Sequence, residues 1–333
     1  MSTDTAVSRP ARIKNLMALG RAESPIRLAR DYGVVLSAVG LIVALAVASA
    51  PFRTATNQFN LLDQWSAIAI IACGSTICII AGGFDLSVDA IYALSGVVSA
   101  WSIVHTHSVL LGFVLGIASG IVMGLFNGIL VTYGGINPFV ATIASSVAFL
   151  GIAQLITKGS IISVTDPKFS SIGLKSFGNL TLLSVVFIVF AVGASLLLGR
   201  TVLGRRIYAV GGNYEAARYS GIAVKRIQVF SYVVSGLSAS VAGVLVASRN
   251  SSGSADVRTQ LAFQAITAVV IGGVSIYGGE GTIPRALVGV LILALIGNGF
   301  NLLAVDPAYQ QVLLGVIIVL AVAIDAWARK KQT

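Results

Sequence analysis

Charge is scarce in this sequence. Asp, Glu, Lys and Arg together make up 10% of the 333 residues, whereas hydrophobic residues make up 56%. Soluble domains contain roughly one quarter charged residues. This composition and a mean hydropathy of +0.93 exclude an ordinary soluble protein and indicate a polytopic membrane protein. The net charge of +10 falls mostly in the tails and one loop, as it does in the cytoplasmic flanks of membrane spans.

Reactive side chains are also few. The sequence has two cysteines, Cys73 and Cys78, in one apolar run, and we interpret them as small buried hydrophobes rather than as a disulfide or a metal pair. Its two histidines, His105 and His107, fall in a short turn and are interpreted as interfacial residues rather than ligands. We therefore predict no catalytic constellation and no metal site.

A phosphate-binding loop is missing, because no glycine directly precedes any of the seven lysines, and the loop requires that pair. Hydrolysis of ATP by that route is excluded, and we predict that this chain binds no cofactor itself. Nucleic acid is an improbable partner, since no basic surface carries interleaved aromatic residues for stacking on bases.

Long apolar runs dominate what is present. Each is close to the roughly 20 residues that cross a bilayer. We predict an all-α polytopic membrane protein with about ten transmembrane helices, between a polar tail at 1–31 and a short tail at 329–333, with the membrane domain over 32–328. The expected spans lie at about 33–50, 61–82, 86–105, 108–133, 138–158, 181–199, 227–248, 261–279, 285–304 and 310–327.

The first apolar run ends in VASAP at 47–51, which resembles a signal-peptidase site, so a cleaved signal peptide is the alternative. The basic region before it is long and the apolar core is wide for a signal peptide, which favours a retained span. A ten-span arrangement then places sixteen of the 22 Lys and Arg residues on the side of the N-terminus and six on the other. The positive-inside rule therefore predicts that both termini are cytoplasmic.

The same orientation puts the longest polar stretch, 199–226, in the cytoplasm. A short helix is expected inside it. Asn213 can cap its N-terminus, Glu215 suits the positive end of its dipole, and Gly221 can end it in the left-handed conformation. Such a helix is too short to be stable alone in water, which suggests that another protein holds it; an ordinary connector is the alternative. The candidate coupling residues are Asn213, Glu215, Ala216, Ala217, Arg218 and Gly221.

Polar residues interrupt the apolar runs at a few places. Asp85, in GGFDLS at 82–87, is expected to cap the helix that follows, and Pro138, in NPFVAT at 137–142, fits the first turn of a helix. Gly112, Gly116, Gly120 and Gly124 recur at every fourth position, which favours close helix packing. Polar groups inside a membrane often line a path, so the candidates for a translocation path are Asp85, Ser87, Asn137, Phe139, Thr142, Asn298 and Asn301.

From about Asn60 to Asp325 the chain resembles the permease subunits of ABC importers for ribose and related monosaccharides. The segments that carry the resemblance, in order and spacing, are GGFDLS, NPFVAT, AITAVVIGG (265–273), NGFNLL (298–303) and QQVLLG (310–315). Within 199–226, Glu215-Ala216-Ala217 followed by Gly221 resembles the conserved core by which importer permeases dock on an ATPase. The more distal part of that motif is absent.

This resemblance implies a bacterial inner-membrane permease that works with a second, identical or different permease, two ATP-hydrolysing subunits, a periplasmic sugar-binding protein and surrounding membrane lipid. ATP would be bound on the partner subunits and a monosaccharide or polyol would be the substrate. The sequence departs from the family pattern in two places. Asp89 stands where glycine is usual, and Ala262-Phe263-Gln264 stands where two acidic residues usually flank a leucine.

Three other functions remain open from the sequence. An ion-coupled secondary transporter needs buried acids or histidines, but acids near membrane depth are scarce: Asp85 and Asp89 lie at a helix start and Asp325 lies near the end of the last span. An ABC permease for an amino acid or a nucleoside shares the general architecture. A structural membrane scaffold would not need a coupling helix.

Overall fold

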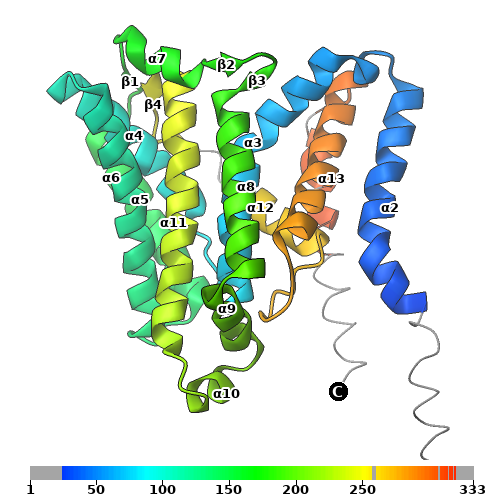
Figure 1. Ribbon diagram of the computed structural model, residues 1–333. Coiled ribbons are helices and arrows are strands. Elements are labelled where there is room, and N and C mark those ends of the chain that lie inside the picture. Colours follow the sequence, from blue (N-terminus) through cyan, green and yellow to red (C-terminus); the bar gives the residue numbers. More distant parts are fainter. Residues whose placement is uncertain (1–24, 257–259, 307, 314, 318, 320–333) are drawn as a thin grey trace, which may run out of the picture.

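Helices make up most of the described chain. The computed structural model describes residues 25–256, 260–306, 308–313, 315–317 and 319 (Figure 1). Seven of its helices are long and apolar enough to cross a membrane, which confirms the predicted all-α polytopic membrane fold. They are α3 (Ala55–Ile80), α4 (Val88–Thr106), α5 (Val109–Thr132), α6 (Pro138–Thr157), α8 (Leu182–Arg200), α11 (Val224–Arg249) and α13 (Ile283–Leu302).

Shorter apolar helices account for other predicted spans. The apolar part of α2 (Pro25–Ala48) is Gly33–Ala48, which covers most of the first expected run, and α12 (Gln260–Ile271) contains only the first part of the run expected at 261–279. The described residues of 308–317 are also helical. The total of ten spans stays a prediction, because the last run continues into residues outside the described ones.

Consecutive helices run in alternating directions between two ends of one bundle (Figure 1). The first, which we name the α10 end, holds α9 (Val202–Gly212), α10 (Tyr214–Tyr219) and the start of α2. The opposite, α7 end holds the short helices η1 (Pro51–Arg53) and α7 (Pro167–Gly173). There β1 (Ile162–Ser163) pairs antiparallel with β4 (Ser252–Gly253), and β2 (Ser176–Phe177) with β3 (Leu180–Thr181).

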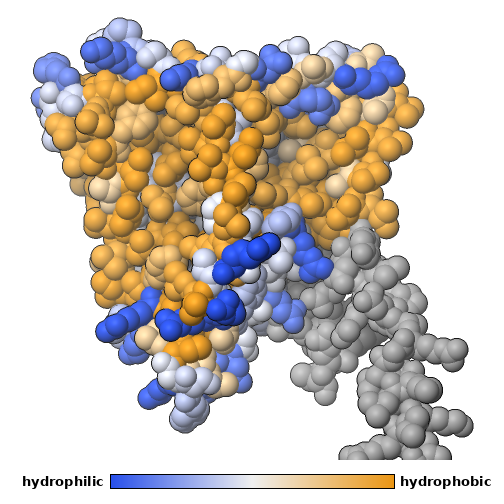
Figure 2. Space-filling view, in the orientation of Figure 1, coloured by the Kyte–Doolittle hydropathy of each residue, from blue (hydrophilic) through white to orange (hydrophobic). Residues whose placement is uncertain are grey.

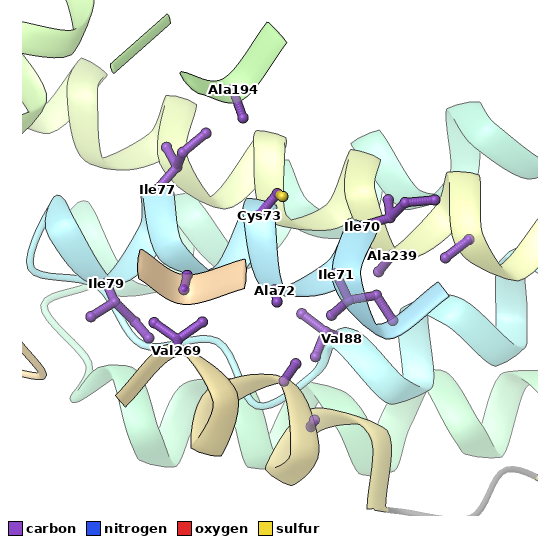
Figure 3. Packing of buried hydrophobic residues seen from close by; sticks show 14 of the residues in the cluster. Ile70, Ile71, Ala72, Cys73, Ile77, Ile79, Val88, Ala194, Ala239 and Val269 are labelled. Carbon is purple, nitrogen blue, oxygen red and sulfur yellow. The ribbon is translucent and has the colours of Figure 1, made fainter. Parts of the chain in front are cut away.

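Helix α3 is the centre of the bundle, with 89% of its most apolar window buried. Figure 3 shows Ile70, Ile71 and Cys73 of this helix facing side chains from the helices around it. Cys73 and Cys78 are both free and fully buried, which agrees with their interpretation as small hydrophobes. The neighbours labelled in Figure 3 are Val88 of α4, Ala194 of α8, Ala239 of α11 and Val269 of α12.

Helix α5 packs tightly on α4 and α11 through its glycines. A Cβ atom at Gly116 would lie 2.9 Å from the carbonyl oxygen of Ser95, and one at Gly120 would lie 2.7 Å from that of Gly236. Both are closer than real Cβ atoms approach, so only glycine allows these backbone contacts. The predicted close packing of this helix is confirmed.

An apolar surface separates the two polar ends (Figure 2). Only 28% of the apolar windows of α5, α6 and α8 is buried, so their outer faces are left for lipid or for other subunits. Basic residues lie at both ends of the bundle. Those at the α10 end are Arg200, Arg205, Arg206, Arg218, Lys225, Arg226 and Arg285; those at the α7 end are Arg53, Lys158, Lys168, Lys175 and Arg249.

The polar stretch 199–226 contains more structure than the sequence predicted. The expectation of one short helix missed α9, an eleven-residue helix that begins two residues after α8 ends. Its buried residues are Gly204, Ile207 and Val210, which are spaced three apart and form a narrow apolar stripe. Ile207 and Val210 of this stripe pack into the bundle core. The helix was not predicted because basic residues surround the few apolar ones in this stretch.

Candidate functional site

Residues 81–87, which include the whole polar motif GGFDLS, break the helical path between α3 and α4. Gly82 has a φ of +81°, which turns the chain away from α3. Asp85, only 3% exposed, accepts hydrogen bonds from the amide of Ser87 (3.0 Å), the hydroxyl of Ser87 (2.6 Å) and the hydroxyl of Ser235 on α11 (2.7 Å). Its carboxylate therefore ties the break to a helix 150 residues later in the chain.

The expectation that Asp85 caps α4 is wrong. The N-cap of α4 is Ser87, whose side chain makes no capping hydrogen bond. Asp85 lies two residues earlier and receives the amide of Ser87 itself, not an amide of the first helical turn. A local capping rule misassigned this aspartate because its third partner comes from α11, which no local pattern reveals.

Helices α5 and α6 and a second residue of α11 contribute to the same place. Asn127 of α5 donates to the hydroxyl of Ser87 (2.7 Å), and the hydroxyl of Thr142 on α6 accepts the amide of Leu86 (3.1 Å). The hydroxyl of Tyr232 on α11 accepts the amide of Phe84 (3.1 Å) and donates to its carbonyl oxygen (3.3 Å). We name this group the break cluster; it consists of Asp85, Ser87, Asn127, Thr142, Tyr232 and Ser235.

Of the sequence candidates, the structure brings Asp85, Ser87 and Thr142 together in the break cluster. Asn137 instead caps α6, where it accepts the amides of Phe139 (2.9 Å) and Val140 (3.4 Å). Pro138 occupies the first turn of α6 as expected. Phe139 is 51% exposed, and its ring centroid lies 6.2 Å from that of Phe84.

Sequence reasoning missed Asn127, Tyr232 and Ser235 of the break cluster. Each is a polar residue within an otherwise apolar span, which is the signal that could have found them. Ser231, Ser235 and Ser238 of α11 are all fully buried, and their spacing of three to four residues places them on one helix face.

The other two path candidates lie away from the break, toward the α7 end. Asn298 of α13 exchanges two amide hydrogen bonds with Asn57 of α3, at 3.1 and 3.0 Å. Asn301 is exposed. Next to this amide pair, a cavity of about 280 Å³ opens between α3, α8 and α13. Its lining is mostly apolar and includes Trp65, with Gln58 and Ser66 as polar groups.

A second buried carboxylate, Asp63 of α3, was not anticipated. It is 7% exposed and forms an ion pair with Arg249 at the end of α11. It also accepts a hydrogen bond from the hydroxyl of Thr181 (2.5 Å). The ion pair joins α3 to α11 at the α7 end, whereas Asp85 joins the break to α11. Asp325, the acid that the sequence placed near the last span, lies outside the described residues.

Both departures from the family pattern are in described helices. Asp89 is 5% exposed and accepts the amide of Ala90 (2.8 Å) and the hydroxyl of Ser146 on α6 (3.4 Å). Ala262 is 1% exposed and faces the core of the bundle. In the described part of the chain, no group of three or more His, Cys, Asp or Glu side chains could hold a metal ion.

The α10 helix has the two ends that the sequence predicted. The side chain of Asn213 accepts the amide of Ala216 (2.9 Å), and Gly221, with a φ of +79°, follows the helix. The amides of Gly221 and Ile222 donate to the carbonyl oxygens of Arg218 (3.0 Å) and Ala217 (3.1 Å), which is the Schellman arrangement.

Of the two alanines among the candidate coupling residues, only Ala216 faces outward from α10. Ala217 is only 4% exposed and belongs to the core cluster of its own chain. Ala216 is exposed, as are Glu215 and Arg218. Tyr219 is 86% exposed at the helix end. Consecutive helical residues point about 100° apart, so one alanine anchors α10 to the permease while the other faces away.

Comparison with known proteins gives the family. Residues 57–322 match the family described as "branched-chain amino acid transport system / permease component". The chain belongs to this permease family. Among curated proteins it is similar to the ribose import permease protein RbsC of Bacillus subtilis, with 38% identity over 88% of this chain and 90% of that protein.

Other relatives in the family have comparable similarity. RbsC of Escherichia coli K12 is 38% identical over 89% of this chain and 94% of its own. The L-arabinose ABC transporter permease protein AraH of Azospirillum brasilense is 36% identical over 90% of this chain and 88% of its own. No solved structure matches. This permease is thus a transport subunit rather than an enzyme, and a multi-pass protein of the inner membrane.

Proposed function

We propose that this permease forms the membrane pathway of an ABC importer for a monosaccharide, with a ribose-like pentose, a hexose or a polyol as its substrate. The similarity over nearly the whole chain to permeases named for ribose and for arabinose carries the proposal. The family description names branched-chain amino acids, but the similar curated permeases are named for pentoses.

The proposed assembly contains a second permease, two ABC ATPase subunits on the cytoplasmic side and a periplasmic sugar-binding protein. ATP binds to the ATPase subunits, not to this chain. The outer faces of α5, α6 and α8, which are mostly unburied, offer the apolar surface that a second permease and lipid require.

In the proposed orientation the α10 end faces the cytoplasm. The basic side chains of the polar stretch 199–226 lie at this end. Basic residues favour the cytoplasmic side of short loops. The start of α2 is at the same end (Figure 1), so the N-terminal tail would also be cytoplasmic.

Helix α10 is the proposed contact with an ATPase subunit. It projects from the bundle (Figure 1) and exposes Ala216 and Tyr219. A helix of six residues is marginal in water, yet its caps and the buried Ala217 hold it in shape. The small side chain of Ala216 allows a groove on the partner to approach closely, and Tyr219 can fill a pocket there, as aromatic residues often do at interfaces.

Substitution of Ala216 tests this function. Ala216→Arg changes an exposed residue, so we expect a folding cost within about 0.5 kcal/mol. Docking should fail, because the long charged side chain must be buried in the groove or must push the helix out. The matched control is Ser171→Arg, which places the same side chain at an exposed position of the α7 end.

The measurement is co-purification of the ATPase subunit together with ATP-dependent uptake of D-ribose and L-arabinose in cells. We expect loss of both with Ala216→Arg and retention of the ATPase subunit with Ser171→Arg, because the α7 end lies opposite the proposed ATPase contact. Wild-type uptake that continues without the ATPase would support ion-coupled transport instead. An Ala216→Arg variant that keeps ATPase binding and uptake would reduce α10 to a connector.

A further inference from the structure

Three backbone segments that are distant in sequence meet at the α10 end without side chains between them. They are the end of α3 with the start of the break (Ile80 to Gly82), the end of α9 (Gly211), and the loop between α12 and α13 (Gly278 and Gly279). The amide of Gly279 donates to the carbonyl oxygen of Ile80 at 2.9 Å. We name this meeting point the glycine junction; it consists of Ile80, Gly82, Gly211, Gly278 and Gly279.

The junction has no room for a side chain. A Cβ atom at Gly211 would collide with the carbonyl oxygen of Ile80 and lie 2.7 Å from the amide nitrogen of Gly279. A Cβ atom at Gly278 would lie 3.0 Å from the carbonyl oxygen of Gly211 and 3.1 Å from the Cα of Gly82. All these neighbours are backbone atoms, so a larger residue would have to move whole segments. The three segments are therefore fixed against one another.

Helix α9 connects this junction directly to α10, with one residue between the two helices. Asn213 ends α9 by donating its amide to Ala209 (3.1 Å) and starts α10 by accepting the amide of Ala216 (2.9 Å). One residue thus caps both helices, and no flexible linker separates them. A second contact joins α9 to the same loop, because the hydroxyl of Tyr208 donates to the carbonyl oxygen of Gly281 (2.7 Å).

The 81–87 segment connects the junction to the break cluster. Gly82 is three residues from Asp85, whose carboxylate joins Ser87 and Ser235. The loop at Gly278 and Gly279 leads into α13, whose Asn298 lies near the cavity between α3, α8 and α13. Tightly packed contacts of this kind pass on movement because they do not deform continuously.

We propose that the glycine junction transmits the movement of α10 to both interrupted membrane segments, the 81–87 break and the loop before α13. Gly211 is then a positioning residue for transport: it contacts neither the substrate nor the ATPase, but it sets the break and the loop relative to α10. This inference rests on the proposed function, since it requires that an ATPase subunit moves α10.

The test compares two adjacent glycines. Gly211→Ala fills the junction, whereas Gly212→Ala places the same methyl group 3.9 Å from its nearest neighbour, the Cα of Gly279, which is an ordinary van der Waals contact. Both variants would be purified as the full complex of permease, ATPase subunits and binding protein in lipid vesicles. ATPase activity is measured with and without the binding protein loaded with D-ribose or L-arabinose.

We expect Gly211→Ala to retain its ATPase subunits but to lose stimulation by sugar about fivefold or more, the size of typical coupling between sites. Gly212→Ala should behave as wild type. If neither sugar stimulates the wild-type complex, these two pentoses are refuted as substrates. A second measurement tests the junction without sugar: Phe84→Cys replaces the half-buried Phe84 of the break with a cysteine, and the rate at which a thiol reagent labels this cysteine is followed. Its labelling rate should change on trapping with ATP and vanadate in Gly212→Ala and stay constant in Gly211→Ala.

A nucleotide-dependent labelling change in Gly211→Ala equal to that in Gly212→Ala would overturn the proposal. If Gly211→Ala fails to insert, Tyr208→Phe replaces it, since this variant removes only the hydroxyl that bonds to Gly281. We then expect partial loss of stimulation and of the labelling change with normal insertion. If Gly211→Ala does not insert and Tyr208→Phe keeps wild-type stimulation and a wild-type labelling change, the junction serves only for packing, and the proposal is refuted.

Discussion

Substitutions of Asp85 can distinguish a structural role of its buried carboxylate from a role of its negative charge in transport. Its two oxygens accept three hydrogen bonds, two from Ser87 and one from Ser235. Asp85→Ala removes all three acceptor contacts in a fully enclosed place. A buried donor without a partner costs about 1–3 kcal/mol, so the loss of the acceptor for three donors should destabilise the protein by about 3–9 kcal/mol. That is a large part of the stability of a typical folded protein, which is about 5–15 kcal/mol.

Asp85→Asn should behave differently. The amide oxygen can keep both donors of Ser87, and the amide nitrogen can donate to the hydroxyl of Ser235, which then acts as acceptor. Replacing the carboxylate by a neutral amide also removes the free-energy cost of keeping a charge away from water, which offsets the weaker hydrogen bonds of the amide. The net change should be about 1 kcal/mol or less, since hydrogen bonds contribute about that much each.

The assay measures thermal unfolding of the detergent-solubilised permease and uptake in cells, side by side. Asp166→Asn is the control, because Asp166 caps α7 at the α7 end and asparagine caps as well as aspartate. We expect Asp85→Asn to transport and Asp85→Ala to be poorly folded. An Asp85→Asn variant with normal stability and no uptake would show that the charge itself serves transport. An Asp85→Ala variant as stable as wild type would refute the hydrogen-bond account.

Three further predictions concern orientation and packing. Ser171, exposed at the α7 end, should become accessible from outside as Ser171→Cys; labelling only from the cytoplasm would reverse the assigned orientation. Arg249→Ala leaves the carboxylate of Asp63 without its cation, so thermal unfolding should show that the free energy of unfolding falls by about 1–3 kcal/mol. An unchanged stability would show that the ion pair is solvated and contributes little. Gly120→Ala should cost about 1–3 kcal/mol by overpacking, while Gly193→Ala, with open space around it, should not; equal melting temperatures would contradict the packing account.

The membrane class and most of the spans could be predicted from the sequence, because both depend on local composition. A run such as 108–133 is apolar over a bilayer thickness whatever it packs against, and α5 (Val109–Thr132) follows it closely. The caps of α10 at Asn213 and Gly221 were predictable for the same reason, since each involves residues within one or two turns.

The break cluster and the glycine junction depended on tertiary structure. Ser235 reaches Asp85 across 150 positions, and Gly211 meets Ile80 and Gly279 only after α3, α9 and the loop before α13 are packed. The inward face of Ala217 likewise depends on how α10 rests on its own chain. Local sequence indicates most of the helical segments, but long-range packing selects the partner of each buried polar group and the place where backbones touch.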